Sequence, residues 1–258
     1  MDKEIYGQIV KKKELSQLPK RDVEAAFGNF EKRQVSDSEK VRLTRDLLNQ
    51  MFWPFRSHKL LGLKDKDKDP EWILQKHMST RERLPHYREV YERLFNGFEN
   101  EKELNVLDLG SGINGFSYKF MPKKTCYIGI EAVGQLVQLM NYYFKTRGLN
   151  AMALHESLFS IEKIKKYLNQ IKGRKIVFLF KVLDSLEMIE RDYSKKLLNE
   201  IVPLADRVVV SFATRSMIKK EKFKVNRKWI VEFIKENFKI LDDFETGNER
   251  YIVFMKNL

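Results

Sequence analysis

The hydrophobic positions of this chain follow two different patterns, which meet near residue 103. In residues 1–103, apolar residues recur three and four positions apart, as they do between Val41 and Phe52, and no alternating pattern interrupts them. This spacing is typical of helices that bury one face. Pro19, Pro54 and Pro70 mark the joints between the helices. The pattern predicts an all-helical N-terminal domain, residues 1–103.

One of these helices is predicted from about Glu82 to Phe98, because Tyr87, Val90 and Leu94 lie at helical spacing. The segment immediately before it is rich in hydrogen-bonding side chains. Ser79 or Thr80 is expected to cap the helix.

After residue 103, short apolar runs alternate with amphipathic segments. This alternation predicts an α/β domain, residues 104–258, with a parallel sheet and right-handed crossovers. The run 175–180 is almost entirely apolar, which suits a strand buried on both faces. The final pair of strands is joined by a short Gly-containing hairpin loop, so the last strand is expected to be antiparallel. Strands are predicted at residues 105–109, 126–130, 152–154, 175–180, 207–212, 240–244 and 250–255, and helices from about 115 and at 135–146, 161–171, 191–205 and 226–238.

The first predicted strand ends in a glycine-rich turn, Gly110-x-Gly112-x-x-Gly115. Glycines leave the backbone bare, so that a ligand can approach it closely. Asp108 precedes the first glycine by two positions, and Glu131 ends the next apolar run. A dinucleotide site and an ordinary tight turn are both compatible with these glycines. The combination of turn and strand-end acid resembles motifs I and II of class I S-adenosylmethionine methyltransferases.

Composition excludes several classes of protein. The chain has 258 residues, of which 43% are hydrophobic, so it can build a large core. No apolar run approaches the ~18 to 20 residues of a membrane span, and the N-terminus has no signal-peptide pattern, so we expect a cytoplasmic protein without membrane association. Cys126 is the only cysteine, and the four histidines lack metal-ligand spacing, so no disulfide and no metal are expected.

The net charge of +13 favours a polyanionic partner. Residues 215–228 carry seven basic side chains against the single acid Glu221. This segment follows a predicted strand and is therefore expected at the carboxyl edge of the sheet, where substrates enter α/β enzymes. Phosphate contact is the favoured interpretation and a solvated loop is the alternative. The predicted RNA-binding residues are Arg215, Lys219, Lys220, Lys222, Lys224, Arg227 and Lys228.

Five segments resemble, in order, the aminoglycoside-resistance 16S ribosomal RNA methyltransferases of the ArmA and Rmt type, which methylate guanine N7 in the decoding region. The resemblance covers most of the chain. It implies a class I methyltransferase with a Rossmann-like, seven-stranded mixed sheet, S-adenosyl-L-methionine as cofactor, 16S rRNA or the small ribosomal subunit as partner, and a monomer. The segments are His77-x-Ser79-Thr80-x-Glu82-Arg83, Asp108-x-Gly110-x-Gly112, Phe180-Lys181-x-Leu183-x-x-Leu186-Glu187, Ser211-Phe-x-Thr-Arg-Ser216 and Gly247-Asn-Glu249.

The resemblance also implies roles for single residues. Arg83 would pair with the methionine carboxylate of the cofactor, since guanidinium and carboxylate form strong charge-assisted bonds. Lys181 would face the target base and serve as the catalytic residue, besides lining the cofactor pocket. The remaining expected contacts are His77 and Ser79 closing the pocket, Asp108, Gly110 and Gly112 around the methionine part, Glu131 on the ribose hydroxyls, and Glu156, with Ser157 or Leu158, on the adenine amino group.

The sequence after the strand at 175–180 limits the possible target atoms. Exocyclic-amine methyltransferases usually carry Asp/Asn-Pro-Pro-aromatic there, whereas this chain has Lys181-Val-Leu-Asp184. Carbon-5 methylation of pyrimidines needs a nucleophilic thiol, but Cys126 begins a strand away from the expected mouth. Guanine N7 needs neither group, since positioning and desolvation provide most of the catalysis.

The sequence departs from the family pattern in the stretch after the strand at 207–212, which is Lys-rich where the family's is Gly-rich and contains Tyr, and at two single positions. Ala213 and Asp184 stand where family members commonly have proline. Three functions remain open from the sequence: a ribosomal RNA methyltransferase, a class I methyltransferase for another RNA, a small molecule or a protein, and a non-catalytic RNA-binding module.

Overall fold

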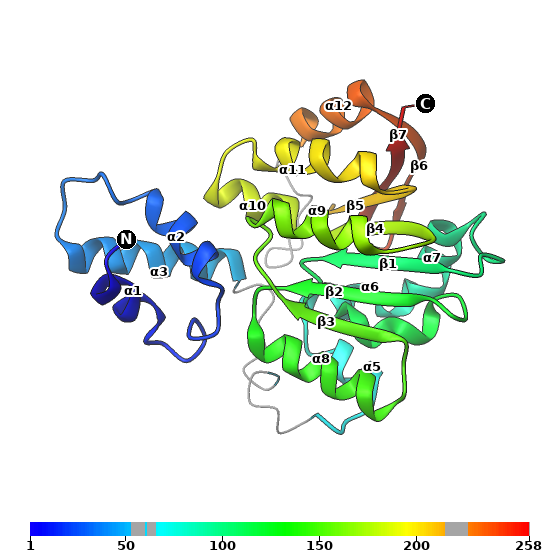
Figure 1. Cartoon of the computed structure of the whole chain (residues 1–258), viewed down its shortest axis with the longest axis horizontal. Coiled ribbons are helices and arrows are strands. Elements are labelled where there is room, and N and C mark those ends of the chain that lie inside the picture. The colour runs from blue at the N-terminus through cyan, green and yellow to red at the C-terminus, as the bar shows by residue number, and fades with distance from the viewer. Residues whose placement is uncertain (53–59, 61–65, 215–226, 258) are drawn as a thin grey trace.

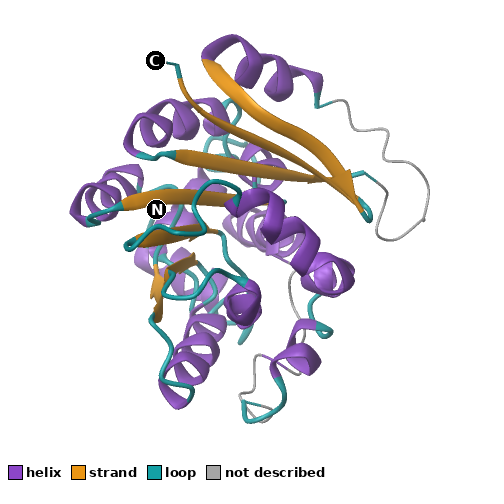
Figure 2. Cartoon of the chain, turned by 90° about the vertical axis from the view of Figure 1, so that its right-hand side faces the viewer, coloured by secondary structure: helices purple, strands orange, loops and turns teal. Residues whose placement is uncertain are grey.

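The centre of the molecule is a mixed sheet, drawn in orange in Figure 2. Its seven strands lie in the order β3-β2-β1-β4-β5-β7-β6. The computed structural model describes residues 1–52, 60, 66–214 and 227–257. Strands β1 to β5 pair in parallel, and β7 runs antiparallel to both β5 and β6. The sheet predicted from the sequence is therefore confirmed, including its antiparallel last strand. The strands are β1 (Leu104–Leu109), β2 (Cys126–Glu131), β3 (Ala151–His155), β4 (Arg174–Phe180), β5 (Arg207–Ala213), β6 (Phe238–Thr246) and β7 (Glu249–Lys256).

Helices form two layers about this sheet. The chain first winds outward from β1 to β3 and then returns to β4, so right-handed crossovers place the two sets of helices on opposite faces. One layer is built around the 3-10 helix η3, which contacts α5, α7 and α8, and the other around α11, which contacts α9, α10 and α12. The bounds are α5 (Pro70–Leu74), α7 (Tyr87–Phe95), η3 (Asn114–Phe120), α8 (Gly134–Thr146), α9 (Ile161–Gln170), α10 (Leu183–Ile189), α11 (Tyr193–Ile201), η4 (Val202–Leu204) and α12 (Lys228–Asn237).

Strand β4 is buried on both faces, as its apolar run predicts. Phe178 in this strand has no exposed surface, and its ring lies 6.0 Å from the rings of Tyr91 and Phe95 on α7. Although α7 precedes the sheet in the sequence, it belongs to the helical layer that covers the sheet. The predicted domain boundary after residue 103 stays a prediction.

The first helices form a separate group at one end of the molecule (Figure 1). They are α1 (Lys3–Val10), α2 (Lys20–Gly28) and α3 (Asp37–Phe52). Helix α3 contacts α10, and the Asn29 amide donates a hydrogen bond to the Ile189 carbonyl at 2.9 Å. These contacts bring α2 next to the carboxyl edge of the sheet.

Two predicted helices are wrong in their bounds. The helix expected from Glu82 to Phe98 is instead α6 (Met78–Arg83), the 3-10 turn η2 (Leu84–His86) and α7. Pro85 causes the break, because proline has no N–H for the helical ladder and its ring crowds the preceding turn. The helix expected at 191–205 is shorter, and it is preceded by α10, which has only seven residues and was not predicted.

Among the described helices, none combines the length and the apolar character that a membrane crossing requires.

Candidate active site

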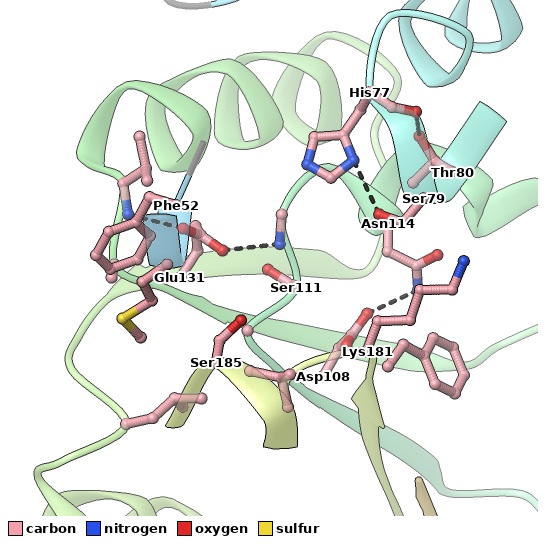
Figure 3. A pocket seen from close by; sticks show the side chains of 18 of the residues that line it. Phe52, His77, Ser79, Thr80, Asp108, Ser111, Asn114, Glu131, Lys181 and Ser185 are labelled. Carbon is pink, nitrogen blue, oxygen red and sulfur yellow. Dashed lines mark hydrogen bonds between the residues drawn. The ribbon is translucent and has the colours of Figure 1, made fainter. Parts of the chain in front are cut away.

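A pocket opens at the carboxyl ends of β1, β2 and β4, where the strand order of the sheet reverses (Figure 3). Open α/β sheets bind their ligands at such a point. Nine of the residues nominated by the sequence line it: His77, Ser79, Arg83, Asp108, Gly110, Gly112, Leu158, Glu131 and Lys181.

The glycine turn and the strand-end acid form one unit. Gly110 and Gly112 have φ values of 71° and 54°, in the left-handed region that favours glycine. A Cβ atom on Gly110 would lie 2.7 Å from Val182, so a larger residue would also collide. The Glu131 carboxylate accepts hydrogen bonds from the backbone N–H groups of Gly112 and Val133, both at 2.8 Å. The turn is therefore fixed by the acid that was predicted to bind the ligand.

Glu131 keeps the ability to accept further hydrogen bonds. Each carboxylate oxygen carries two lone pairs, and each of these oxygens has one backbone donor. Burial raises the pKa of Glu131, and the backbone donors oppose that rise in part.

Asp108 belongs to a buried hydrogen-bond network beneath the turn. Its carboxylate accepts from Asn114 Nδ2 at 2.7 Å and from the Tyr127 hydroxyl at 2.8 Å. Asn114 Oδ1 accepts in turn from Arg83 Nη1 at 3.0 Å and from the Tyr87 hydroxyl at 2.8 Å. Burial raises the pKa of Asp108 to about 6. Asn114 was not nominated from the sequence, although an amide between the glycines of the turn is a usable signal.

Arg83 and Lys181 share a buried carboxylate, Glu249. Arg83 Nη2 lies 2.6 Å from Glu249 Oε1, and Lys181 Nζ lies 3.2 Å from Glu249 Oε2. Glu82 supplies a second acceptor to Lys181 at 2.9 Å. Burial alone would raise the pKa of Glu249, but the two cations hold it below its usual range. The short string Gly247-Asn-Glu249 thus provides the counter-charge for both cations.

The backbone at Lys181 is held in an uncommon conformation. Its φ is 56°, in the left-handed region, which residues other than glycine rarely adopt. Its N–H donates to the Ser211 carbonyl at 3.1 Å and to Ser211 Oγ at the same distance. Ser211 Oγ also donates to Glu249. Strain of this kind persists where the surroundings over-determine the geometry, often at functional sites.

The segment before α6 closes the pocket from the N-terminal side. The Ser79 hydroxyl and His77 Nδ1 are hydrogen-bonded at 3.1 Å (Figure 3). The Thr80 hydroxyl donates to the carbonyls of Leu74, at 2.6 Å, and His77, at 3.1 Å. The imidazole of His77 lies over the glycine turn, where a Cβ on Gly112 would meet it at 3.2 Å.

Glu156 and Ser157, predicted to hold the adenine amino group, are not among the lining residues. The Glu156 carboxylate accepts from Lys163 Nζ at 2.7 Å and from the Ser157 N–H at 3.0 Å. Desolvation would raise its pKa, but Lys163 and the backbone donor lower the pKa below its usual range. Ser157 Oγ accepts from the Phe159 N–H at 3.0 Å. Their adenine contact stays a prediction, and Leu158 does line the pocket.

Two of the predicted RNA-binding residues can be placed. Arg227 forms a fork with the Asp184 carboxylate, with Nη2 to Oδ2 at 2.7 Å, and its Nη1 donates to the Ala213 carbonyl at 2.6 Å. Asp184 therefore anchors the start of α12. Lys228 lies on the surface, where its Nζ atom is 3.3 Å from Glu232 Oε1. The others, Arg215, Lys219, Lys220, Lys222 and Lys224, lie outside the described residues.

Asp22, on α2, also lines the pocket and was not nominated from the sequence. Its exposure is 1%, and within the described residues its Oδ2 atom has no hydrogen-bond partner. Burial raises the pKa of Asp22 to about 7, with a smaller opposing contribution from the Ser157 side chain. Nothing in the sequence distinguishes it from the other acids of the N-terminal helices.

The described residues contain no group of histidine, cysteine and acidic side chains that could hold a metal ion.

The chain matches a known family over most of the residues that build this site. The model of the FmrO family, described as ribosomal RNA methyltransferase, matches residues 69–237, from the start of α5 to the end of α12. The chain belongs to this family.

Several solved structures share the fold of this chain. The 16S rRNA methyltransferase RmtF, in complex with S-adenosyl-L-homocysteine, superposes with a TM-score of 0.78 at 21% identity over 100% of both chains. The 16S rRNA methylase RmtB gives 0.78 at 19% identity over 98% of both. An rRNA methylase from Escherichia coli gives 0.74 at 18% identity over 98% of this chain and 100% of its own. At these identities the likeness establishes the fold, and the predicted class I methyltransferase architecture is confirmed.

Proposed function

We propose that this member of the FmrO family uses S-adenosyl-L-methionine to methylate guanine N7 of 16S rRNA in the decoding region of the small ribosomal subunit, a modification of the aminoglycoside-resistance type. Family membership supports the rRNA methyltransferase activity. The observation that carries the cofactor assignment is the Glu131 carboxylate, which is held against the glycine turn at the carboxyl edge of the sheet. RmtF, which shares the fold, was solved with the demethylated form of this cofactor.

The pocket fits the parts of the cofactor in order. Glu131 can accept hydrogen bonds from the ribose hydroxyls, and the glycine backbone leaves room for the methionine part. The contacts of Arg83 with Glu249, Asn114 and Tyr251 leave part of its guanidinium N–H set for the methionine carboxylate. Ala132, Val133 and Leu158 offer an apolar surface to the adenine ring. When bound, the cofactor supplies an electrophilic methyl group.

Guanine N7 fits a site that holds Lys181 fixed and offers no thiol. In the described pocket lining there is no cysteine, and N7 carries a lone pair that needs no deprotonation. Guanine presents O6 beside N7 as a second acceptor. We assign Lys181 the role of donating to O6, which would hold N7 towards the cofactor. Its salt bridges with Glu82 and Glu249 hold the ammonium group in place.

The remaining assignments follow from charge and substrate. The net charge of +13 suits an RNA partner. The basic residues of the 215–228 segment are assigned to phosphate contacts, except Arg227, whose guanidinium is paired with Asp184. The enzyme is assigned to the cytoplasm as a monomer, where it would meet ribosomal particles.

The test is incubation with labelled S-adenosylmethionine and either small ribosomal subunits or free 16S rRNA, followed by a base-resolution map of the methyl group. We expect one labelled guanine, at N7, in the decoding region. Label on another atom or another RNA would refute the target while leaving the methyltransferase activity. Absence of label from RNA at every stage of subunit assembly would refute the proposal.

A further inference from the structure

The N-terminal helical group, residues 1–52, forms one wall of the candidate cofactor pocket. The Gln135 amide on α8 donates to the Lys13 carbonyl at 3.2 Å, and the Gly134 N–H donates to the Gln17 carbonyl at 3.4 Å. A Cβ on Gly134 would lie 2.7 Å from Gln17 Oε1, so the two segments approach closely. This junction lies directly after β2, the strand that ends in Glu131. Helix α2 is thereby held over the pocket.

Asp22 projects from α2 into this pocket with an unsatisfied acceptor. A buried polar atom normally has a hydrogen-bond partner, because leaving it without one is unfavourable. The Oδ2 atom of Asp22 has no such partner within the described residues, and the side chain is fully enclosed. Negative charge from Glu131 and Glu156 also acts on it. A ligand group that donates a hydrogen bond would satisfy this atom.

The surroundings of Asp22 favour one donor over the others. Glu131 ends β2 and is placed for the ribose, whereas Ala132, Val133 and Leu158 form an apolar surface suited to a flat base. Glu156, the acid that the sequence nominates for the adenine amine, is turned to Lys163 and the Ser157 N–H. Among the described carboxylates that line the pocket, Asp22 is the one with a buried oxygen lacking a partner.

We infer that Asp22 accepts a hydrogen bond from the exocyclic amine of the cofactor's adenine, so that the N-terminal helices take part directly in cofactor recognition. This inference rests on the proposed function. Asp22 discriminates adenine from a base that carries a carbonyl at the same position, because two acceptors would then face each other. Docking of the N-terminal helices and binding of the cofactor therefore reinforce each other.

The experiment is a calorimetric titration at pH 8.5, where the Asp22 carboxyl is ionised. The ligands are S-adenosylhomocysteine and its deaminated analogue, S-inosylhomocysteine, in which a carbonyl replaces the amine. The proteins are the full chain, Asp22→Ala, Asp22→Asn and the matched control Glu24→Gln, which changes a more exposed acid on the same helix. The unmodified chain should bind the adenosine compound at least about tenfold more tightly than the inosine compound, the ratio expected for one hydrogen bond to a charged acceptor. Glu24→Gln should keep that preference.

In Asp22→Ala the affinity for S-adenosylhomocysteine should fall about tenfold while that for the inosine compound stays unchanged or rises, so the preference disappears. In Asp22→Asn the amide can donate to the inosine carbonyl, which should reduce or reverse the preference. If Asp22→Ala does not fold, as judged by thermal unfolding without ligand, Asp22→Asn decides. A preference unchanged in a folded Asp22 variant overturns the inference and leaves the proposed function intact. Failure of the unmodified chain to bind either compound refutes the proposed function itself.

Discussion

The charged side chains at the two ends of the pocket differ in whether they are paired in salt bridges. At one end Arg83 and Lys181 are both paired with Glu249, and Lys181 is also paired with Glu82. At the other end no salt bridge joins Asp22 or Glu131 to a described cation, and burial raises the pKa of both carboxyl groups. At the first end both cations are paired without a ligand, and Arg83 keeps only part of its N–H set for the methionine carboxylate. The second has acceptor capacity that only a donor-rich ligand would use.

This difference separates two physical tasks. A base must be held within a fraction of an ångström for methyl transfer, so the groups around it should be fixed before the substrate arrives. A cofactor that enters and leaves in each cycle is better held by groups that gain their partners on binding, because only then does the contact add affinity. The two ends should accordingly respond to substitution in different measurements.

The largest expected effect is on stability at the paired end. Glu249→Gln removes the counter-charge and leaves Arg83 and Lys181 buried beside a neutral amide. Breaking a buried ion pair in this way costs roughly 3 kcal/mol or more. The free energy of unfolding, measured by urea denaturation, should fall by about that amount, whereas Glu245→Gln, at the surface end of β6, should change it by less than about 1 kcal/mol. A loss of equal size in the two variants would contradict the pairing described above.

A similarly large effect, on binding, is expected at the open end. Glu131→Ala removes the acceptor for the ribose and releases the N–H groups of Gly112 and Val133. Affinity for S-adenosylhomocysteine should fall about 100-fold, as expected for hydrogen bonds to a charged acceptor. Isothermal titration measures this, with Glu162→Gln on α9 as the exposed control. Retained affinity in a folded Glu131→Ala variant would show that the ligand lies elsewhere.

A smaller effect is expected on turnover when the group assigned to the base is removed. Lys181→Ala should lower kcat on small subunits by roughly 10- to 100-fold, because the base loses its fixed contact. Cofactor affinity should change little, whereas Arg83→Ala should weaken cofactor binding and leave RNA affinity nearly unchanged. Single-turnover kinetics and titration on the same preparations separate the two. Equal loss of both functions in either folded variant would contradict these assignments.

The smallest effect is a pH dependence of stability that arises at the open end. The pKa of Asp22 is raised to about 7 from its ordinary value of 3.8, so between these pH values the folded chain binds this proton more tightly than the unfolded chain does. Its contribution to stability is therefore complete below about pH 4 and is lost as the pH rises through about 7.

Asp22→Asn removes this dependence. The free energy of unfolding of the variant, relative to that of the unmodified chain, should therefore increase as the pH rises from 5 to 8. We expect a relative gain of at least about 1 kcal/mol, a conservative part of the roughly 4 kcal/mol that the full shift would give. Asp108, whose pKa is also raised, is present in both proteins and cancels. Parallel stability curves would show that Asp22 is ionised in the folded chain throughout this range.

The sequence predicts the sheet and the turn well, because both depend on residues that are close in the chain. Asp108, Gly110 and Gly112 lie within five positions, and Glu131 ends the next strand. Parallel strands then place their carboxyl ends at one edge, whatever the rest of the chain does. The same local reasoning fails at Pro85, where one ring divides an apparently continuous helix.

Contacts between distant segments could not be predicted from local pattern. The motifs nominate Arg83, Lys181 and Glu249. They do not predict that the one carboxylate pairs with both cations, because positions this far apart in the sequence meet only through the order of the strands. The sequence predicts a contact between Arg83 and the methionine carboxylate of the cofactor. It does not predict that the guanidinium also binds Glu249, Asn114 and Tyr251. The sequence does not predict that Asp22 lines the pocket, since its burial depends on how α2 docks against the sheet.

The position of Glu249 in the final hairpin has a consequence for synthesis. A growing chain that has not yet produced β7 contains both cations without the carboxylate that compensates them, so it can neither close this end of the pocket nor hold Lys181 in place. Competence for methyl transfer therefore arises late, when the hairpin joins the edge of the sheet.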